Sequence, residues 1–176
     1  MTEKSKKMTL IADSLAKVDP DVNRGIWDMA QNLSEQEIIC FFNQTALDFF
    51  TFAINITKKM GKEREYGFSG YMMLFETTLK MNKSVPVDQF TILILEFAPD
   101  IYNANEKFFL DMYIPDGKIG KGNNNGNEFN IIQSQEFKKL WLALDSADKE
   151  NIKERIIVLT TYAHAYFYKL LMSKTN

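Results

Sequence analysis

Apolar residues recur every three or four positions along almost the whole chain, which is the spacing of helices with one buried side. The segments with this spacing cover residues 8–18, 20–32, 34–61, 68–79, 84–101, 103–112, 134–144 and 148–171. Pro99 lacks an amide hydrogen and its ring clashes with the preceding turn, so it kinks or divides the helix predicted at 84–101. The pattern predicts an all-α fold, a single-domain bundle of about seven helices.

The strongest of these segments begins at Ser34. Ser34 and Glu37 form the pattern of a capping box, in which the side chain of each residue bonds the backbone amide of the other. Apolar residues then occupy two sides of the predicted helix, with Ile38, Phe41, Phe42, Phe49, Phe52 and Ile56 on one and Ile39, Ala46, Phe50 and Ile54 on the other. A helix that is apolar on several sides is contacted by neighbours on those sides. We therefore expect it to be the hydrophobic central helix of the bundle.

A line of polar residues runs between these two apolar sides, at Gln44, Asp48, Thr51 and Asn55. The simplest interpretation is that this line is the side of the helix that faces solvent. The alternative is a buried hydrogen-bonded network, or one half of a ligand pocket between helices. Asp48 would be the base of an enzyme of that kind, although the sequence offers no second activated group beside it.

The last predicted helix carries more apolar surface than one buried face uses. Its core stripe consists of Ile152, Ile156, Leu159, Ala163, Tyr166 and Leu170. Tyr162, Phe167, Tyr168 and Leu171 lie on its other sides. Such residues are either covered by the fold or exposed as a contact surface. Because the segment 38–56 already claims the central position, we predict that these four residues form an interaction surface.

Residues 115–130 differ in composition from the helical segments around them. They contain four glycines and the run Asn123-Asn124-Asn125, which predicts a flexible loop, with a small hairpin over 113–131 as the alternative. The glycines do not make a phosphate-binding or calcium-binding loop, because Asn123 stands where the first needs lysine and Lys121 where the second needs a ligand. The segment is too short to separate two domains, so residues 1–176 are expected to form one domain.

Charge and the rare residue types narrow the classes of function. The net charge is −2, so the chain lacks the basic surface expected of a protein that binds nucleic acid. Its single histidine, His164, and single cysteine, Cys40, cannot supply the usual metal ligands, and no motif supports a nucleophile pair between them. Polar residues interrupt every long apolar stretch, so no transmembrane segment is expected. The sequence predicts a cytoplasmic protein without metal or cofactor.

Several short motifs resemble those of a known group of proteins. They are Glu106-Lys107-Phe108-Phe109, the glycine-asparagine spacer, Glu136-Phe137-Lys138-Lys139-Leu140-Trp141, and Asp148-Lys149-Glu150-Asn151-Ile152 at the start of the last helix. This order of a Phe-x-x-Leu-Trp segment before a Lys-x-x-Ile helix resembles uncharacterised helical proteins of large nucleocytoplasmic DNA viruses. Their phenylalanine-rich N-terminal helix is similar to residues 42–52. The resemblance covers roughly a third of the chain, contains no catalytic motif, and implies a viral protein, in the virion or acting on host factors.

Three functions follow from these observations. The first is a non-enzymatic helical module for protein interaction or assembly, with another protein or with itself, which fits the near-neutral charge and the surplus of aromatic residues. The second is a bundle that resembles the Bcl-2 type in architecture and binds a partner's helix in a groove. The third is a small-ligand binder or enzyme that uses Asp48. We expect the first, and therefore no catalytic residue.

Overall fold

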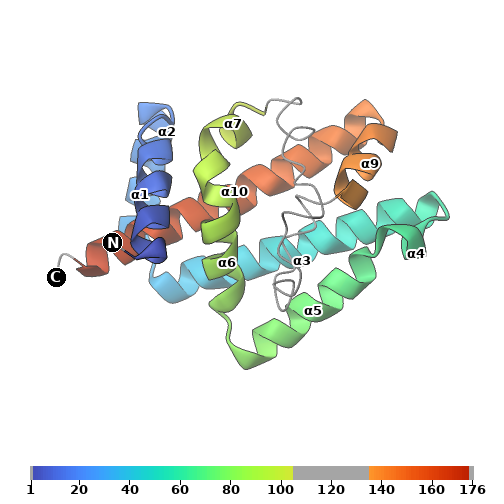
Figure 1. The fold of residues 1–176 in the computed structure, drawn as a ribbon, viewed down its shortest axis with the longest axis horizontal. Helices are drawn as coiled ribbons and strands as arrows, with labels where there is room; N and C mark the ends of the chain where they lie inside the picture. The colour runs from blue at the N-terminus through green and yellow to red at the C-terminus, as the bar shows by residue number, and fades with distance from the viewer. Residues whose placement is uncertain (1, 105–134, 175–176) are drawn as a thin grey trace.

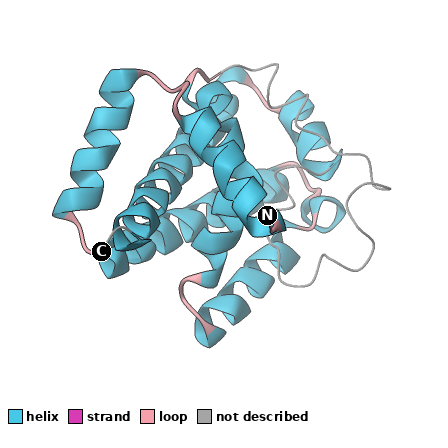
Figure 2. Ribbon diagram, turned by 60° about the vertical axis from the view of Figure 1, so that its left-hand side comes forward, coloured by secondary structure: helices cyan, strands magenta, loops and turns pink. Residues whose placement is uncertain are grey.

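The computed structural model describes residues 2–104 and 135–174, and every regular element in these two ranges is helical (Figures 1 and 2). In chain order the elements are α1 (Glu3–Leu15), α2 (Pro20–Asn32), α3 (Glu35–Lys59), α4 (Glu63–Tyr66), α5 (Phe68–Met81), α6 (Val85–Ile94), the 3-10 turn η1 (Leu95–Phe97), α7 (Ala98–Tyr102), α9 (Gln135–Ala143) and α10 (Ser146–Lys174). The all-α prediction is confirmed. The predicted loop at 115–130, its hairpin alternative at 113–131 and most of the helix predicted at 103–112 lie outside the described residues.

Local signals set several helix boundaries where the sequence placed them, whereas the first helix, predicted at 8–18, spans Glu3–Leu15, and the short helix α4 was not predicted. The Ser34 hydroxyl accepts from the Glu37 amide at 3.1 Å, and the Glu37 carboxylate accepts from the Ser34 amide at 3.1 Å, so the capping box is complete. Asp19 caps α2, whose first residue is Pro20. Pro99 lies in the first turn of α7, after the short turn η1 that ends the preceding helix. It therefore divides the segment, because a proline is tolerated only where a helix begins.

The cap of α3 has a measurable effect on stability. Replacing Ser34 by alanine removes a side-chain acceptor from an amide that has no partner within the helix, and we expect the free energy of unfolding to fall by about 1 kcal/mol. Urea unfolding followed by circular dichroism measures the change. Thr51→Ala, at an exposed position of the same helix, is the control and should not lower stability, because alanine has the higher helix propensity. An equal loss in both variants would contradict a specific role of the cap.

Two long helices, α3 and α10, share the centre of the molecule. They lie side by side and run in opposite directions across it, with α3 in cyan and α10 in orange and red (Figure 1). α3 also contacts α4, α5 and α6, whereas α10 also contacts α2, α6 and α7. The core formed between them includes the fully buried side chains Phe42, Phe49, Phe50, Ile152, Ile156 and Leu159. The sequence predicted α3 as the central helix, and the structure adds α10 to that position.

Among the described helices, α3 is the one whose length and composition would allow it to cross a membrane. A core helix of a folded domain has the same properties. In the structure, α3 buries phenylalanines from two of its sides against neighbouring helices and exposes Gln44 and Asp48. The hydrophobic core therefore accounts for its apolar composition.

Candidate functional site

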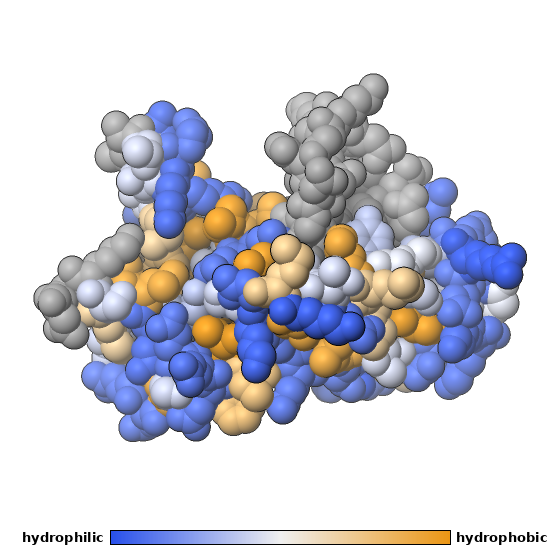
Figure 3. All heavy atoms as spheres, turned by 90° about the horizontal axis from the view of Figure 1, so that it is seen from below, coloured by the Kyte–Doolittle hydropathy of each residue, from blue (hydrophilic) through white to orange (hydrophobic). Residues whose placement is uncertain are grey.

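Exposed apolar side chains are scattered over several helices. Figure 3 shows one face of the molecule, on which small apolar clusters are separated by polar side chains. The most exposed large apolar residues are Met81, Met73, Leu142, Leu10 and Ile92, which belong to four helices. Scattered apolar residues of this kind are normal on a protein surface. Exposure alone therefore does not identify a functional surface. Contacts that hold exposed side chains in a fixed arrangement are a better indication of one.

One such contact is an aromatic pair at the seam between α3 and α10. The rings of Phe41 and Tyr162 stack with 5.7 Å between their centroids and 29° between their planes. Phe41 is 36% exposed, and Tyr162 is partly exposed. Val158, one turn before Tyr162 on α10, is 40% exposed. These three side chains form an apolar patch whose two rings are held in place by each other.

Polar groups continue the seam beyond this patch. The Arg155 guanidinium donates from Nε to Oδ2 of Asp48 at 2.8 Å and lies over the Phe52 ring, 4.0 Å from its centroid. A second nitrogen, Nη1, donates to the main-chain carbonyl of Asn151 at 3.1 Å. A shallow hollow of about 440 Å³ lies beside this ion pair. We call Phe41, Thr45, Asp48, Arg155, Val158 and Tyr162 together the α3–α10 surface.

The predicted polar line of the central helix faces solvent. Gln44, Asp48, Thr51 and Asn55 are all exposed, so the alternative of a buried network among them is wrong. Asp48 is paired with a cation, Arg155. An exposed ion pair of this kind is worth between about 0 and 1 kcal/mol. Asp48 therefore belongs to the polar part of the α3–α10 surface.

The four predicted interaction residues of α10 do not share one face. Tyr162 contacts Phe41 of α3, whereas Tyr168 packs against Trp27 of α2 with 5.1 Å between the ring centroids. Leu171 is partly buried. Phe167 is only 1% exposed and lies in the core, so its prediction as a surface residue is wrong. The reason is that α10 has neighbours on several sides, which cover more of it than a surface helix would bury.

Phe41 and Trp27 are exposed aromatic residues that the sequence pattern did not predict as part of an interaction surface. Phe41 was placed in the apolar stripe of the central helix. It also precedes Gln44 by three residues, which puts it at the edge of the exposed polar line. This spacing from Gln44 is the feature of the sequence that could have indicated the exposure of Phe41. Trp27 lies next to the buried Ile26 in α2 and is 39% exposed, and nothing in the local sequence distinguishes such a tryptophan from a buried one.

A group of polar aromatic side chains is buried where α10 meets α7 and α2. His164 is fully buried, and its Nδ1 lies 3.0 Å from the Tyr102 hydroxyl. The His164 ring is 4.6 Å from that of Tyr168, whose hydroxyl donates to Asn23 at 2.7 Å. Burial lowers the pKa of His164 to about 3, and burial raises the pKa of both tyrosines. All three side chains are therefore uncharged at neutral pH and link the helices by hydrogen bonds.

A second tyrosine links α10 to α6. The Tyr166 hydroxyl donates to Oδ1 of Asp88 at 2.5 Å. Burial, followed by the hydrogen bond and the charge of Asp88, raises the pKa of Tyr166. This contact joins α10 to α6, as the contact of His164 joins α10 to α7.

The described residues offer little for nucleophilic or metal chemistry. His164 is bonded to Tyr102 in the core, whereas Cys40 is exposed, which is not the arrangement of a nucleophile pair. Within residues 2–104 and 135–174, no group of three or more His, Cys, Asp or Glu side chains could hold a metal ion. The predictions of no enzyme activity and no cofactor stay predictions.

The two C-terminal motifs of the viral resemblance pack against each other. Phe137, Leu140 and Trp141 of α9 are buried. The Lys149 ammonium lies 5.7 Å from the centroid of the Trp141 ring, and Ile152 is fully buried. The Phe-x-x-Leu-Trp and Lys-x-x-Ile patterns therefore join α9 to the start of α10. Their role in the structure is to build the core.

These features define a helical protein with a two-helix core and an ordered aromatic patch at its surface. The chain is 43% identical over 174 residues to the uncharacterized protein R465 of Acanthamoeba polyphaga mimivirus, across 99% of this chain and 94% of that protein. It belongs to the same family. No protein-family profile and no solved structure matches the chain. The resemblance to uncharacterised helical proteins of large nucleocytoplasmic DNA viruses is thereby confirmed.

Proposed function

We propose that this protein is a non-catalytic assembly module of viral type, and that it associates with a second copy of itself through the α3–α10 surface. The viral relative supports the viral setting, since the identity extends over nearly the whole of both chains. The mode of action rests on the surface of this chain. The sequence predicts either a protein partner or self-association, and we propose self-association.

The observation that carries the proposal is the stacked pair of Phe41 and Tyr162. Aromatic side chains are the commonest anchors of protein interfaces, because they bury a large area and have few rotatable bonds. Each ring here already restricts the other, so less side-chain freedom is lost when a partner covers them. Val158 extends the apolar area beside them.

The surroundings of the pair match the anatomy of an interface. The ion pair of Asp48 and Arg155 lies beside the apolar patch, as polar groups surround the apolar centre of most interfaces. α3 and α10 run antiparallel, so a two-fold rotation can place the same two helices of a second copy opposite them. The result is a contact of four helices in which each aromatic patch meets the other copy.

The test is the mass of the protein in solution. Light scattering over about 1 to 100 µM protein covers the dissociation constants expected of a modest self-contact. The wild-type chain should give a multiple of its 20.4 kDa mass at the upper end. The double variant Phe41→Ser/Tyr162→Ser should give the monomer mass at every concentration, because the apolar centre of the contact is lost.

Met73→Ser is the matched control. Met73 is 69% exposed on α5, more than either aromatic residue, and lies outside the α3–α10 surface. The variant should assemble like the wild type, and circular dichroism should show that all variants remain helical. A wild-type chain that stays monomeric throughout would contradict the proposal. An equal loss of assembly in Met73→Ser would also contradict it, because apolar exposure in general would then be the cause.

A further inference from the structure

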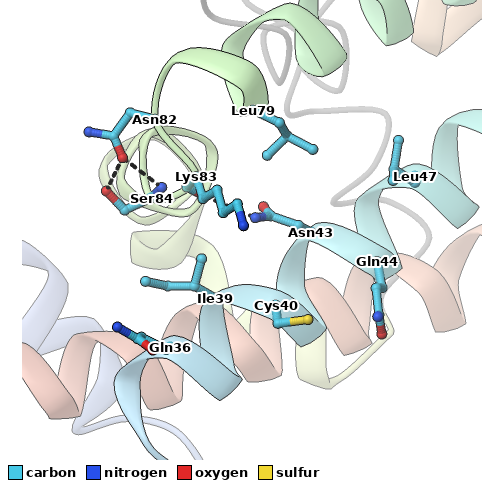
Figure 4. A pocket seen from close by; sticks show the side chains of 10 residues that line it. All are labelled: Gln36, Ile39, Cys40, Asn43, Gln44, Leu47, Leu79, Asn82, Lys83 and Ser84. Atoms are coloured by element: carbon cyan, nitrogen blue, oxygen red, sulfur yellow. Dashed lines mark hydrogen bonds between the residues drawn. The ribbon is translucent and has the colours of Figure 1, made fainter.

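A larger hollow lies on a neighbouring side of α3, between that helix and the turn that joins α5 to α6, and shares Gln44 with the hollow beside Asp48 (Figure 4). Its volume is about 650 Å³, within the range of pockets that bind small molecules. It is lined by Gln36, Ile39, Cys40, Asn43, Gln44, Leu47, Leu79, Asn82, Lys83 and Ser84. We call it the α3–α5 pocket. It is independent of the aromatic patch and of the function proposed above.

The feature that distinguishes this pocket is a buried carboxamide. Asn43 is only 8% exposed, and Figure 4 shows its side chain pointing from α3 toward the turn that carries Lys83. Its Nδ2 donates to the main-chain carbonyl of Lys83 at 3.0 Å. Its Oδ1 is enclosed and has no hydrogen-bond partner among the described residues. A buried acceptor of this kind favours a ligand that brings a donor to it.

The other lining residues narrow the chemistry of the ligand. Ile39, Leu47 and Leu79 supply apolar contacts from α3 and α5. Lys83 is the one charged residue in the lining, and its ammonium disfavours a cation. An apolar wall with a few polar groups at defined positions is the usual construction of a small-molecule site.

We infer that the α3–α5 pocket binds a small, uncharged or anionic molecule with an apolar body and one hydroxyl or N–H donor. The donor bonds Oδ1 of Asn43, and the apolar body lies against Leu47 and Leu79. The hydrogen bond from Nδ2 to the Lys83 carbonyl fixes the carboxamide at the wall of the pocket and leaves Oδ1 without a protein donor. The site therefore selects for a donor as well as for apolar area.

A partner's helix is a poorer occupant of this pocket. A helix bound in a groove needs a row of apolar positions along its length. Here Gln36, Asn82 and Ser84 supply polar groups to the lining, and the three apolar side chains form one short wall. The Bcl-2-like mode considered from the sequence would need a longer apolar strip than this pocket provides.

Cys40 allows the proposal to be tested in the unmodified chain. It is exposed, lines the pocket and is the single cysteine of the sequence, so the rate of its alkylation reports whether the pocket is occupied. The probes are 1-naphthol, which has an apolar body and one hydroxyl donor, and 1-methoxynaphthalene, in which a methyl group replaces the donated hydrogen. The rate of reaction with iodoacetamide is followed by mass spectrometry at increasing probe concentration.

1-Naphthol should slow alkylation of Cys40 in a saturable manner. 1-Methoxynaphthalene should need at least about a tenfold higher concentration for the same effect, because it leaves Oδ1 of Asn43 without a donor. Absence of protection by 1-naphthol up to its solubility limit would overturn the proposal. Equal protection by both probes would overturn it as well, since binding would then not depend on Asn43.

Two variants locate the site. Leu79→Trp fills the pocket and should abolish protection by 1-naphthol. Met81→Trp adds the same ring on the same helix at a position that is 83% exposed and outside the lining, so protection should persist. Protection that survives in a folded Leu79→Trp protein would place the probe elsewhere and overturn the proposal. If Leu79→Trp does not fold, the comparison of the two probes on the wild-type chain decides alone.

Discussion

Replacing Phe167 by alanine should lower the free energy of unfolding by about 3–5 kcal/mol, the range for removing a buried phenylalanine ring. Phe167 is 1% exposed, so the variant loses both the transfer of the ring from water and the packing around it. Urea unfolding at a protein concentration low enough for a monomer measures the loss. The effect is a large part of the total stability of an ordinary domain.

Phe41→Ala is the matched control for this experiment, because it removes the same side chain from a position that is 36% exposed. Its loss should be smaller, about 1–2.5 kcal/mol, because the exposed ring loses less burial along with its aromatic pair and leaves no enclosed cavity. The two variants compare the stability lost at a core position of α10 with the stability lost at the seam between α3 and α10. Equal losses in both would show that Phe167 is not held in the core as described.

The stability of the protein should fall steeply with pH below 6.5 because of His164. In the unfolded chain His164 has its ordinary pKa of 6.5, whereas burial lowers the pKa to about 3 in the folded protein. Between these values the unfolded chain binds one more proton, so stability rises with pH in this window and is lost as the pH falls. The slope from this group is about 1.4 kcal/mol per pH unit, on the order of 5 kcal/mol over the whole window.

His164→Asn isolates this contribution from that of the carboxylates. The asparagine oxygen can accept from the Tyr102 hydroxyl but does not titrate, so the variant should show a flatter dependence of stability on pH between 3 and 6.5. Tyr102→Phe is the control, because it removes the hydrogen bond and keeps the buried imidazole, and it should retain the slope. The measurement is urea unfolding at several pH values. A slope in His164→Asn equal to that of the wild type would contradict the assignment.

The prediction of the fold from the sequence succeeded where the determinants are local. The spacing of apolar residues gave the helices, since one buried side of a helix repeats every three or four residues. Ser34 with Glu37 and Pro99 marked boundaries that the structure has at the same places. The exposed side of α3 could also be predicted from the sequence, because its polar residues recur with the same period as the apolar ones.

The prediction of α10 failed in part because burial of a helix depends on the number of its neighbours. The sequence showed a core stripe and a surplus of aromatic residues on the other sides. Whether Phe167 is covered is decided by α2, α3, α6 and α7, which all contact α10. No local pattern contains that information, because these helices are distant in sequence and their packing is set by the whole fold.

By itself, the sequence determined most of the helical elements, the cap of α3, and the apolar character of both central helices, because these follow from contacts within a few residues. Only the tertiary structure decided which exposed groups meet. Phe41 and Tyr162 are brought together by the antiparallel packing of α3 and α10. Oδ1 of Asn43 is buried without a hydrogen-bond donor only because the turn at Lys83 packs beside α3. Both candidate sites are formed between helices, where the geometry depends on side-chain packing across the bundle rather than on the order of residues in one segment.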